Sequence, residues 1–433
     1  MTVVDPQAGG YVTAFRAGAR RPGTSNLNFQ AGQTVATTVI LPVSRAGKIQ
    51  LFNGSTGDVQ LIIDITGYTL SGVAVQGAVW AWGAGDNGQL GNGSTTSSPV
   101  PVPVFGLGDV TAVAGGWFAG YALRGDGTVW SWGAGAFGQR GTGGCCAIVS
   151  PVPLRIPGLS HVTAVAGGYG TGYALRSDGT VWSWGDGQSG ALGDGDDESY
   201  STVPVQVAGL QHRQITAIAA GIVTGYALTS DGSVWAWGAG NVGQLGNDGT
   251  SNSLATQVSQ LSNVTAIAAG GSTGYAVVGH DTVWAWGDDS WGELGDGQKG
   301  PTSRSLVPVE VPGLTGVTAI AAATFTGYAL RGDGTVAAWG LGHYGQLGNN
   351  TTTTVSAGPV PVAVPAGVTA VAAGGLTGYA LRAGTAWAWG AGDLGQLGNG
   401  ATTDGLLPAA VPGLTNVTAV AGGGGGTGYA ITR

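Results

Sequence analysis

The side chains that could act as acids, bases or metal ligands are few and widely spaced in this 433-residue chain. Its histidines are His161, His212, His280 and His343, and no two of them have the spacing of a metal site. Catalysis needs an acid, a base or a nucleophile that converge on one place. No serine-hydrolase, zinc-protease or phosphate-binding motif is present. We therefore predict that the chain is not an enzyme and needs no cofactor.

Acidic residues provide the best candidate for a cation site. Four carboxylates fall within five residues, namely Asp194, Asp196, Asp197 and Glu198. Carboxylate oxygens are the ligands that Ca²⁺ prefers, but this order of residues differs from a D-x-D-x-D-G calcium loop. A weaker group is Asp288, Asp289, Glu293 and Asp296. We therefore predict no metal site and interpret the first group as a solvated acidic loop, with Ca²⁺ binding as the alternative.

The chain has two cysteines, Cys145 and Cys146, which are adjacent in a glycine-rich segment. One pair of neighbours cannot cross-link a chain of this length. The two side chains either close a strained ring or remain thiols, and neither state implies catalysis.

The elements that position these residues are repeats of about 50 residues. The pattern Trp-x-Trp-Gly begins at Trp80, Trp130, Trp182, Trp235, Trp284 and Trp387, and a seventh copy reads Ala337-Ala338-Trp339-Gly340. The pattern Gly-Tyr-Ala-(Leu/Val/Ile) occurs seven times, with its tyrosines at Tyr121, Tyr173, Tyr226, Tyr275, Tyr328, Tyr379 and Tyr429. Repetition at such a period indicates a solenoid or a propeller.

Each repeat is interpreted as four strands. In one copy the first three span 162–166, 172–176 and 180–185, and a Pro-rich fourth strand resembles 99–103. The Asp-Gly pairs that begin at Asp126, Asp178, Asp231 and Asp333 predict tight type I′ hairpins between the second and third strands. In each third strand the two tryptophans share one face, so successive sheets can stack on a bulky face and a slim face.

The phase of the repeats indicates how the ring closes. The first copy, 75–103, lacks the two strands that should precede Trp80, and the last copy supplies only those two, at 417–420 and 428–433. We therefore predict an all-β chain in which residues 73–433 form a seven-bladed β-propeller, with N- and C-terminal strands closing one blade. Residues 1–72 are predicted to form a small β-sandwich-like domain, with strands at 11–15, 35–43, 48–52 and 59–65.

Aromatic residues gather where the repeats vary. In a four-stranded antiparallel blade, the turn between strands one and two lies at the same end as the loop between strands three and four. These two segments carry Trp117, Phe118, Phe137, Tyr169, Trp291, Phe325 and Tyr344. Trp117 and Trp291 are the two tryptophans outside the repeated motif. We predict that this rim binds a partner, because aromatic loops on a rigid scaffold suit an interface; packing among the loops is the alternative.

The charge and hydropathy of the chain limit the classes of partner that it could bind. The formal net charge is −8 and no run of Lys or Arg occurs, so we predict no nucleic-acid binding. No stretch of 18 apolar residues is present, which predicts no membrane insertion, and the first residues show no signal-peptide pattern. The expected partner is a protein or a cell-envelope polymer, and the propeller is expected to be a monomer.

The repeat resembles that of the regulator of chromosome condensation (RCC1-type) family. The resemblance rests on V-T-A-V-A-G-G, Y-A-L-R-S-D-G-T-V-W-S-W-G and G-Q-L-G-N-G, and it covers residues 73–433. It implies a seven-bladed propeller. That family includes guanine-nucleotide exchange factors, plant photoreceptors and a secreted actinobacterial inhibitor of β-lactamases. Its repeats often carry His where this chain has Thr, as at Thr171, or Ala119; this departure and the acidic charge argue against exchange activity.

The first 72 residues resemble a small β domain of exported actinobacterial proteins. The resemblance rests on A-G-Y-V-T-A-F-R, S-N-L-N-F-Q-A-G-Q-T-V, K-I-Q-L-F-N and D-I-T-G-Y. Members of that family often carry cysteines at the positions of Ala17 and Gln50. The resemblance implies an extracellular or cell-surface protein. The leading hypothesis is therefore a non-catalytic, protein-binding propeller; the alternatives are an inhibitor of a secreted enzyme such as a β-lactamase and a regulator similar to nucleotide-exchange factors.

Overall fold

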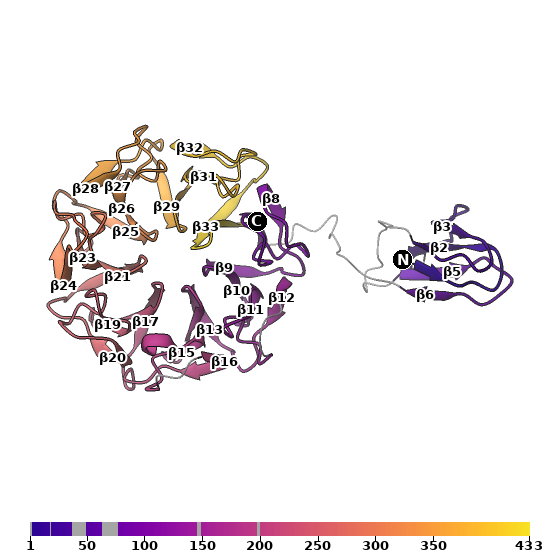
Figure 1. Ribbon diagram of the computed structural model, residues 1–433, viewed down its shortest axis with the longest axis horizontal. Coiled ribbons are helices and arrows are strands. Elements are labelled where there is room, and N and C mark those ends of the chain that lie inside the picture. Colours follow the sequence, from indigo (N-terminus) through magenta and orange to yellow (C-terminus); the bar gives the residue numbers. More distant parts are fainter. Residues whose placement is uncertain (1, 18, 37–48, 63–76, 145–148, 197–199) are drawn as a thin grey trace. The chain divides into compact units, whose positions relative to one another are not determined.

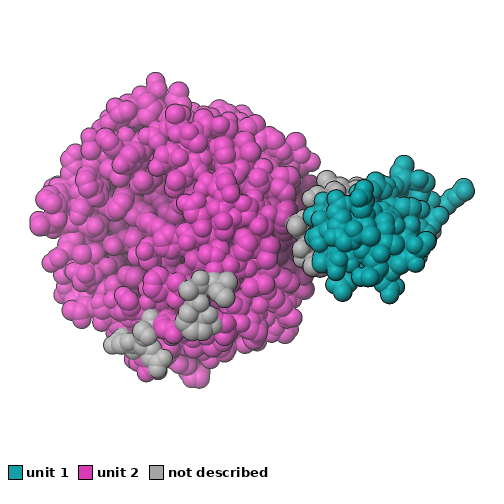
Figure 2. All heavy atoms as spheres, turned by 45° about the vertical axis from the view of Figure 1, so that its right-hand side comes forward, with its two compact units in different colours: residues 1–68 teal, residues 69–433 magenta. Residues whose placement is uncertain are grey.

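The structure is a computed structural model that describes residues 2–17, 19–36, 49–62, 77–144, 149–196 and 200–433 (Figure 1). Contacts within the chain divide it into two units, residues 1–68 and 69–433, which Figure 2 shows in two colours. The domain boundary expected from the sequence, between residues 72 and 73, falls in the segment 63–76, which is outside the described residues.

The first unit consists of two three-stranded antiparallel sheets. One sheet has the order β4 (Val35–Ala36), β1 (Thr2–Val4), β6 (Gln60–Ile62), and the other has the order β3 (Leu27–Phe29), β2 (Gly10–Arg16), β5 (Ile49–Asn53). Val3, Val12, Leu27 and Phe29 from both sheets form one buried cluster, as expected for a sandwich. β2 and β5 correspond to the strands expected at 11–15 and 48–52, and β4 and β6 lie within those expected at 35–43 and 59–65; residues 37–43, 48 and 63–65 of these expected strands are outside the described residues. β1 and β3, of three residues each, are shorter than the four to eight residues over which alternation predicts a strand.

The second unit contains seven four-stranded antiparallel sheets that follow one another around a ring (Figure 1). The first six blades, each with its innermost strand given first, are: β9 (Val110–Gly115), β10 (Ala119–Arg124), β11 (Val129–Gly133), β12 (Ser150–Arg155); β13 (Val162–Gly167), β14 (Thr171–Arg176), β15 (Val181–Asp186), β16 (Tyr200–Gln206); β17 (Ile215–Ala220), β18 (Thr224–Thr229), β19 (Val234–Gly238), β20 (Asn252–Gln257); β21 (Val264–Ala269), β22 (Thr273–Val278), β23 (Thr282–Asp288), β24 (Arg304–Glu310); β25 (Val317–Ala322), β26 (Thr326–Arg331), β27 (Val336–Leu341), β28 (Val355–Pro361); and β29 (Val368–Ala373), β30 (Thr377–Arg382), β31 (Thr385–Gly390), β32 (Gly405–Ala410). A single 3-10 turn, η1 (Gln188–Gly190), is the one helical element among the described residues.

The two ends of the propeller sequence complete the seventh blade, as predicted. Its order is β33 (Val417–Gly423), β34 (Thr427–Thr432), β7 (Ala78–Gly83), β8 (Ser98–Pro103). β34 pairs with β7 over six residues, with Tyr429 opposite Ala81. The Trp80 indole also donates a hydrogen bond to the Thr432 hydroxyl, at 3.1 Å. The ring therefore closes without an unpaired edge inside the last blade.

Neighbouring blades are joined through one backbone carbonyl at each junction. The Gln139 carbonyl accepts a hydrogen bond from the Tyr121 hydroxyl of its own blade at 2.7 Å and from the Trp184 indole of the next blade at 2.9 Å. The same pair of bonds occurs at seven carbonyls, those of Gln89, Gln139, Ala191, Gln244, Glu293, Gln346 and Gln396. Tyrosine and tryptophan therefore bury their rings and satisfy their polar groups together.

The tryptophan at each junction also requires glycine beneath it. A Cβ atom on Gly120 would lie 2.3 Å from Cε2 of Trp132, which pairs with it across the sheet. Trp132 and its six equivalents are fully buried. Burial of one indole removes ~150–250 Å² from water, which is worth on the order of 4–6 kcal/mol before entropy costs. Much of the glycine content thus belongs to blade packing.

The hairpins at the Asp-Gly pairs have the expected position but a different turn type. A type I′ turn needs positive φ at both central residues. In the structure φ is positive at Gly127 (75°) and Gly179 (82°) but not at the aspartates before them. Gly127 N–H donates to the Arg124 carbonyl at 2.9 Å, so each turn is a type I turn followed by a left-handed glycine. The type I′ prediction was wrong because the loop is longer than two residues.

We expect deletion of residues 427–433 to abolish cooperative folding of the propeller. The deletion removes β34, which pairs with both β33 and β7, and exposes two edges of the closing blade. Thermal unfolding followed by near-ultraviolet circular dichroism would measure the effect. Removal of Arg433 alone is the control and should leave the transition unchanged; a cooperative transition in the longer deletion would show that ring closure is dispensable.

Candidate functional site

The turns between first and second strands and the loops between third and fourth strands meet at one end of the propeller. Backbone bonds join them within each blade: Ala134 N–H donates to the Phe118 carbonyl and Leu341 N–H to the Phe325 carbonyl, both at 2.9 Å. We call this the aromatic end, and we call the opposite end, which carries the Asp-Gly turns, the Asp-Gly end. All seven aromatic residues singled out in the sequence lie at the aromatic end.

A closed ring of backbone hydrogen bonds fixes the turns around the centre of this end. In each case an N–H of one blade donates to a carbonyl of a neighbouring blade. The seven bonds run from Trp117 to Gly168 (3.0 Å), Tyr169 to Ile222 (3.1 Å), Ile222 to Gly271 (3.0 Å), Gly271 to Thr324 (3.0 Å), Thr324 to Gly375 (3.1 Å), Gly375 to Gly423 (3.3 Å) and Gly424 to Gly116 (3.2 Å). The side chains of these turns are therefore carried on a backbone that is held on both sides.

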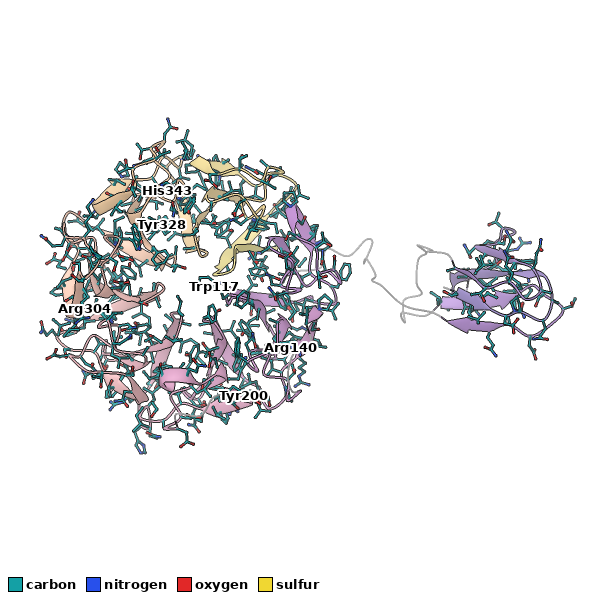
Figure 3. The ribbon with its side chains drawn as sticks, viewed as in Figure 1. Trp117, Arg140, Tyr200, Arg304, Tyr328 and His343 are labelled. Carbon is teal, nitrogen blue, oxygen red and sulfur yellow. The ribbon has the colours of Figure 1, made fainter. Side chains whose placement is uncertain are left out.

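Three of the seven aromatic residues form one cluster next to the central channel. The ring centroids of Trp117 and Tyr169 are 5.2 Å apart, those of Phe118 and Tyr169 are 5.3 Å apart, and those of Trp117 and Phe118 are 6.4 Å apart. Trp117 points toward the middle of the ring of blades (Figure 3). It also packs on Gly424 of the closing blade, where a Cβ would lie 2.7 Å from Cε3 of the indole. All three are half-buried, so part of this cluster is packing.

Three further aromatic residues project from the loops between third and fourth strands. Phe137 is 39% exposed, Trp291 42% and Tyr344 39%. The backbone N–H of each donates to the side chain two residues later, Gln139, Glu293 or Gln346, at 2.7–2.9 Å. Because these acceptors are buried, the backbone is anchored while the rings face outward.

Phe325 is half-buried in its own turn, and the described residues show no ring contact between it and the other six. The structure therefore brings Trp117, Phe118 and Tyr169 together and distributes the others around the ring. Leu394 is equivalent to Phe137 and is 40% exposed, but as an aliphatic residue it is outside the predicted aromatic rim.

The central channel is narrow and uncharged. Its cavity of about 460 Å³ is lined by the innermost strand of every blade, mainly by Gly, Ala and Val, with Trp117 and Tyr169 at the aromatic end. The described residues that line it include no ionisable side chain apart from the Tyr169 phenol. This channel offers no acid–base pair for catalysis.

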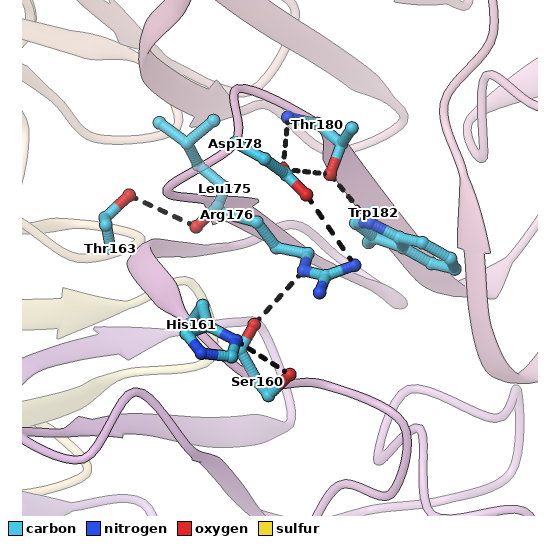
Figure 4. Close-up of polar contacts among 8 residues, drawn as sticks. All are labelled: Ser160, His161, Thr163, Leu175, Arg176, Asp178, Thr180 and Trp182. Carbon is cyan, nitrogen blue, oxygen red and sulfur yellow. Dashed lines mark hydrogen bonds and ion pairs between the residues drawn. The ribbon is translucent and has the colours of Figure 1, made fainter.

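The residues at the Asp-Gly end serve turn structure. Asp178 accepts hydrogen bonds from the Thr180 N–H at 3.0 Å and from its hydroxyl at 2.6 Å, and these bonds lower the pKa of Asp178 (Figure 4). Arg176 lies 3.9 Å from the same carboxylate and donates to the Ser160 carbonyl. His161 has a positive φ of 57°, as do His212 (65°) and His280 (61°), which makes all three turn residues. His343 lies at the aromatic end against Tyr344, with the ring centroids 4.9 Å apart.

The metal candidates show no assembled site. In the first group Asp194 accepts a bond from the Asp196 N–H at 3.2 Å, whereas Asp197 and Glu198 lie outside the described residues, as do Cys145 and Cys146. Across the described part of the chain, no group of three His, Cys, Asp or Glu side chains could hold a metal ion.

Glu293 of the second acidic group is a buried carboxyl in a position that is Gln in five of the other repeats. It is 1% exposed, and its Oε2 accepts from the Trp291 N–H at 2.7 Å, as the Gln oxygens do in their loops. Burial, reinforced by Asp288 and Asp289, raises the pKa of Glu293 to about 8. Asp289 is also buried, and burial raises its pKa; its carboxylate accepts from the Leu294 N–H and the Ser303 hydroxyl. Sequence reasoning considered these residues for metal binding and missed their role in supporting Trp291.

A closed ring of four-stranded antiparallel blades, joined by a repeated aromatic junction, defines a repeat β-propeller. The family model of the RCC1-like domain matches residues 78–428, and the chain belongs to this family. The resemblance expected from the sequence is thereby confirmed for the propeller. In the part of the chain that the structure describes, no helix is long and apolar enough to cross a membrane.

Individual relatives share the domain over part of their length. The human E3 ubiquitin-protein ligase HERC2 is 32% identical over 179 residues, which are 41% of this chain and 3% of HERC2. The ultraviolet-B receptor UVR8 of Arabidopsis thaliana is 30% identical over 173 residues, 39% of each chain. Among solved structures, Prp20p of Saccharomyces cerevisiae aligns with a TM-score of 0.72 at 21% identity, covering 83% of this chain and 93% of Prp20p.

We expect Glu293→Gln to stabilise the propeller increasingly as pH rises. A carboxyl whose pKa is raised on folding favours the folded state below its unfolded pKa of 4.5, and this contribution is lost as pH rises toward about 8. The free energy of unfolding of the wild type should therefore fall over this range relative to that of the variant, at up to about 1.4 kcal/mol per pH unit. Urea unfolding between pH 5 and pH 9 would measure the difference.

Gln244→Glu is the matched control for this prediction. It places a carboxyl at the equivalent buried position of another blade and should introduce a similar pH dependence. Parallel curves for the wild type and Glu293→Gln would show that Glu293 does not bind a proton on folding.

Proposed function

We propose that this chain is a non-catalytic, protein-binding propeller that uses the aromatic end as its binding face, and that it acts outside the cell or at the cell surface. The observation that carries the proposal is the set of exposed rings, Phe137, Trp291 and Tyr344, on loops whose backbone is anchored by buried side chains. A rigid aromatic side chain gives a large contact area at a low cost in conformational entropy.

The variability of this end supports the same proposal. The junction residues are nearly identical from blade to blade, whereas the loop position of Phe137 is Asn87, Ser189, Val242, Trp291, Tyr344 and Leu394 in the other blades. If these loop positions served only for packing, the same residue type could occupy all seven of them. A surface that differs from blade to blade suits recognition of a partner without seven-fold symmetry.

Relatives with this fold support a role in protein binding. The published description of the Prp20p structure refers to its binding properties to Gsp1p and histones, and a second structure shows Kap60 bound to the yeast RCC1. At 21–22% identity these likenesses establish the fold, and the partner of this chain has to be determined independently. The extracellular location rests on the resemblance of residues 1–72 to a domain of exported proteins.

We expect the triple variant Phe137→Ala, Trp291→Ala, Tyr344→Ala to lose a protein that the wild type captures from the native organism's culture supernatant and envelope. Removal of exposed hot-spot rings should weaken the purified complex at least ten-fold. Mass spectrometry would identify the protein, and titration calorimetry would measure the dissociation constant. Trp117 is left intact because its contact with Gly424 contributes to ring packing.

The matched control for this capture is Val100→Ala, Leu254→Ala, Leu407→Ala. These side chains are as exposed as the three rings, at 44–45%, but lie on the outermost strands. Equal loss of the partner in the control, or retention in the aromatic variant, would move the interface away from the aromatic end.

A further inference from the structure

The two ends of the propeller differ in how far nearby basic side chains offset the negative charge of their carboxylates. At the Asp-Gly end each hairpin aspartate has an arginine nearby: Arg124 lies 3.7 Å from Asp126, Arg176 lies 3.9 Å from Asp178, and arginine charges also act on Asp231 and Asp333. Among the described residues, the ion pairs within 4 Å are Arg124–Asp126 and Arg176–Asp178, and both lie at this end. The charges at that end are therefore largely neutralised within the protein itself.

At the aromatic end, the carboxylates outnumber the basic side chains among the described residues. Asp86, Asp196, Asp248, Asp393 and Asp404 are all exposed there, in the loops between third and fourth strands or beside them. The described basic residues at this end are Lys299 and Arg304, which are exposed, and Arg140, which is buried. The carboxylates Asp288, Asp289 and Asp296 also act on one another, and their mutual repulsion contributes to the raised pKa of Asp289. The surplus negative charge of the propeller thus lies on the face that carries the rings.

Acidic and aromatic groups occupy neighbouring positions of the equivalent loops on this face. Asp86 and Asp393 occupy the loop position just before the one that holds Phe137, Trp291, Tyr344 and Leu394 in their blades. A carboxylate pairs with a guanidinium or ammonium group, and an aromatic face attracts the same cations. Within the chain itself, Arg213 lies 3.6 Å from the centroid of the Trp235 ring and Arg21 lies 3.8 Å from that of Phe52.

We propose that the aromatic end binds a protein segment rich in arginine and lysine, whose cations pair with the exposed aspartates and lie against the projecting rings. This inference rests on the proposed function and specifies the chemistry of the partner. Neutral backbone groups and uncharged channel residues occupy the centre of the face, so the charge contacts fall on the outer loops of several blades. A surface of this breadth suits an extended segment that crosses neighbouring blades.

The test compares two variants with the same change in net charge. Asp86→Asn, Asp248→Asn, Asp393→Asn, Asp404→Asn neutralises the aromatic end, and Asp126→Asn, Asp178→Asn, Asp231→Asn, Asp333→Asn neutralises the Asp-Gly end. Asparagine keeps the oxygen that accepts bonds from Ser97, Gln396 and the Gly392 N–H, so the first variant should fold. Thermal unfolding checks that both variants are native.

The probe is a fluorescent dodecapeptide of alternating arginine and alanine, measured by fluorescence anisotropy at low and physiological salt. We expect the aromatic-end variant to weaken binding at least ten-fold and the Asp-Gly-end variant less than two-fold, with affinity falling as salt rises. Equal weakening by both variants would mean that net charge alone attracts the peptide. That result, or no measurable binding to the wild type, would overturn the inference.

The same aspartate variant separates this inference from the proposed function when it is used in partner capture. If Phe137→Ala, Trp291→Ala, Tyr344→Ala loses the captured protein and the aspartate variant retains it, the aromatic end is the interface and the partner is not a basic segment. If both variants retain it, the proposed function fails as well.

Discussion

The propeller depends on a backbone carbonyl that accepts two hydrogen bonds at each junction between blades. One bond comes from a tyrosine hydroxyl of the same blade and the other from a tryptophan indole of the next. Both donors are buried, and burial raises the pKa of Tyr173 to about 12, further above physiological pH than that of an exposed tyrosine. An unsatisfied polar group at this depth would cost about 1–3 kcal/mol. Tyrosine, tryptophan and glycine are therefore required together at each junction.

This junction explains why the variable residues can differ so widely. The carbonyl belongs to the loop that also presents Phe137, Trp291 or Tyr344, two residues before it. The loop is thus fixed by its connection to the neighbouring blade, and the outward side chain contributes little to that connection. A side chain under so little structural constraint is free to be selected for recognition. The aromatic end combines such side chains with unbalanced carboxylates.

Membership of the RCC1-like family accounts for the architecture and leaves the partner open. The matched relatives differ in their whole-protein roles, and this chain aligns with only 3% of HERC2 and 39% of UVR8. What they share with this chain is the stacked blade. Recognition in such a fold resides in the loops, where the present chain has its own pattern of rings and aspartates.

The sequence by itself determined the number and order of the blades, their closure by the two chain ends and the end at which the variable loops lie, because each of these follows from local strand patterns and their spacing. It did not determine the turn type at the Asp-Gly pairs, the support of Trp291 by Glu293 or the contact of Trp117 with Gly424. It also did not show that arginines neutralise one end and leave the other acidic. Those features arise between residues far apart in the chain, and only tertiary packing decides which side chains are buried, paired or exposed.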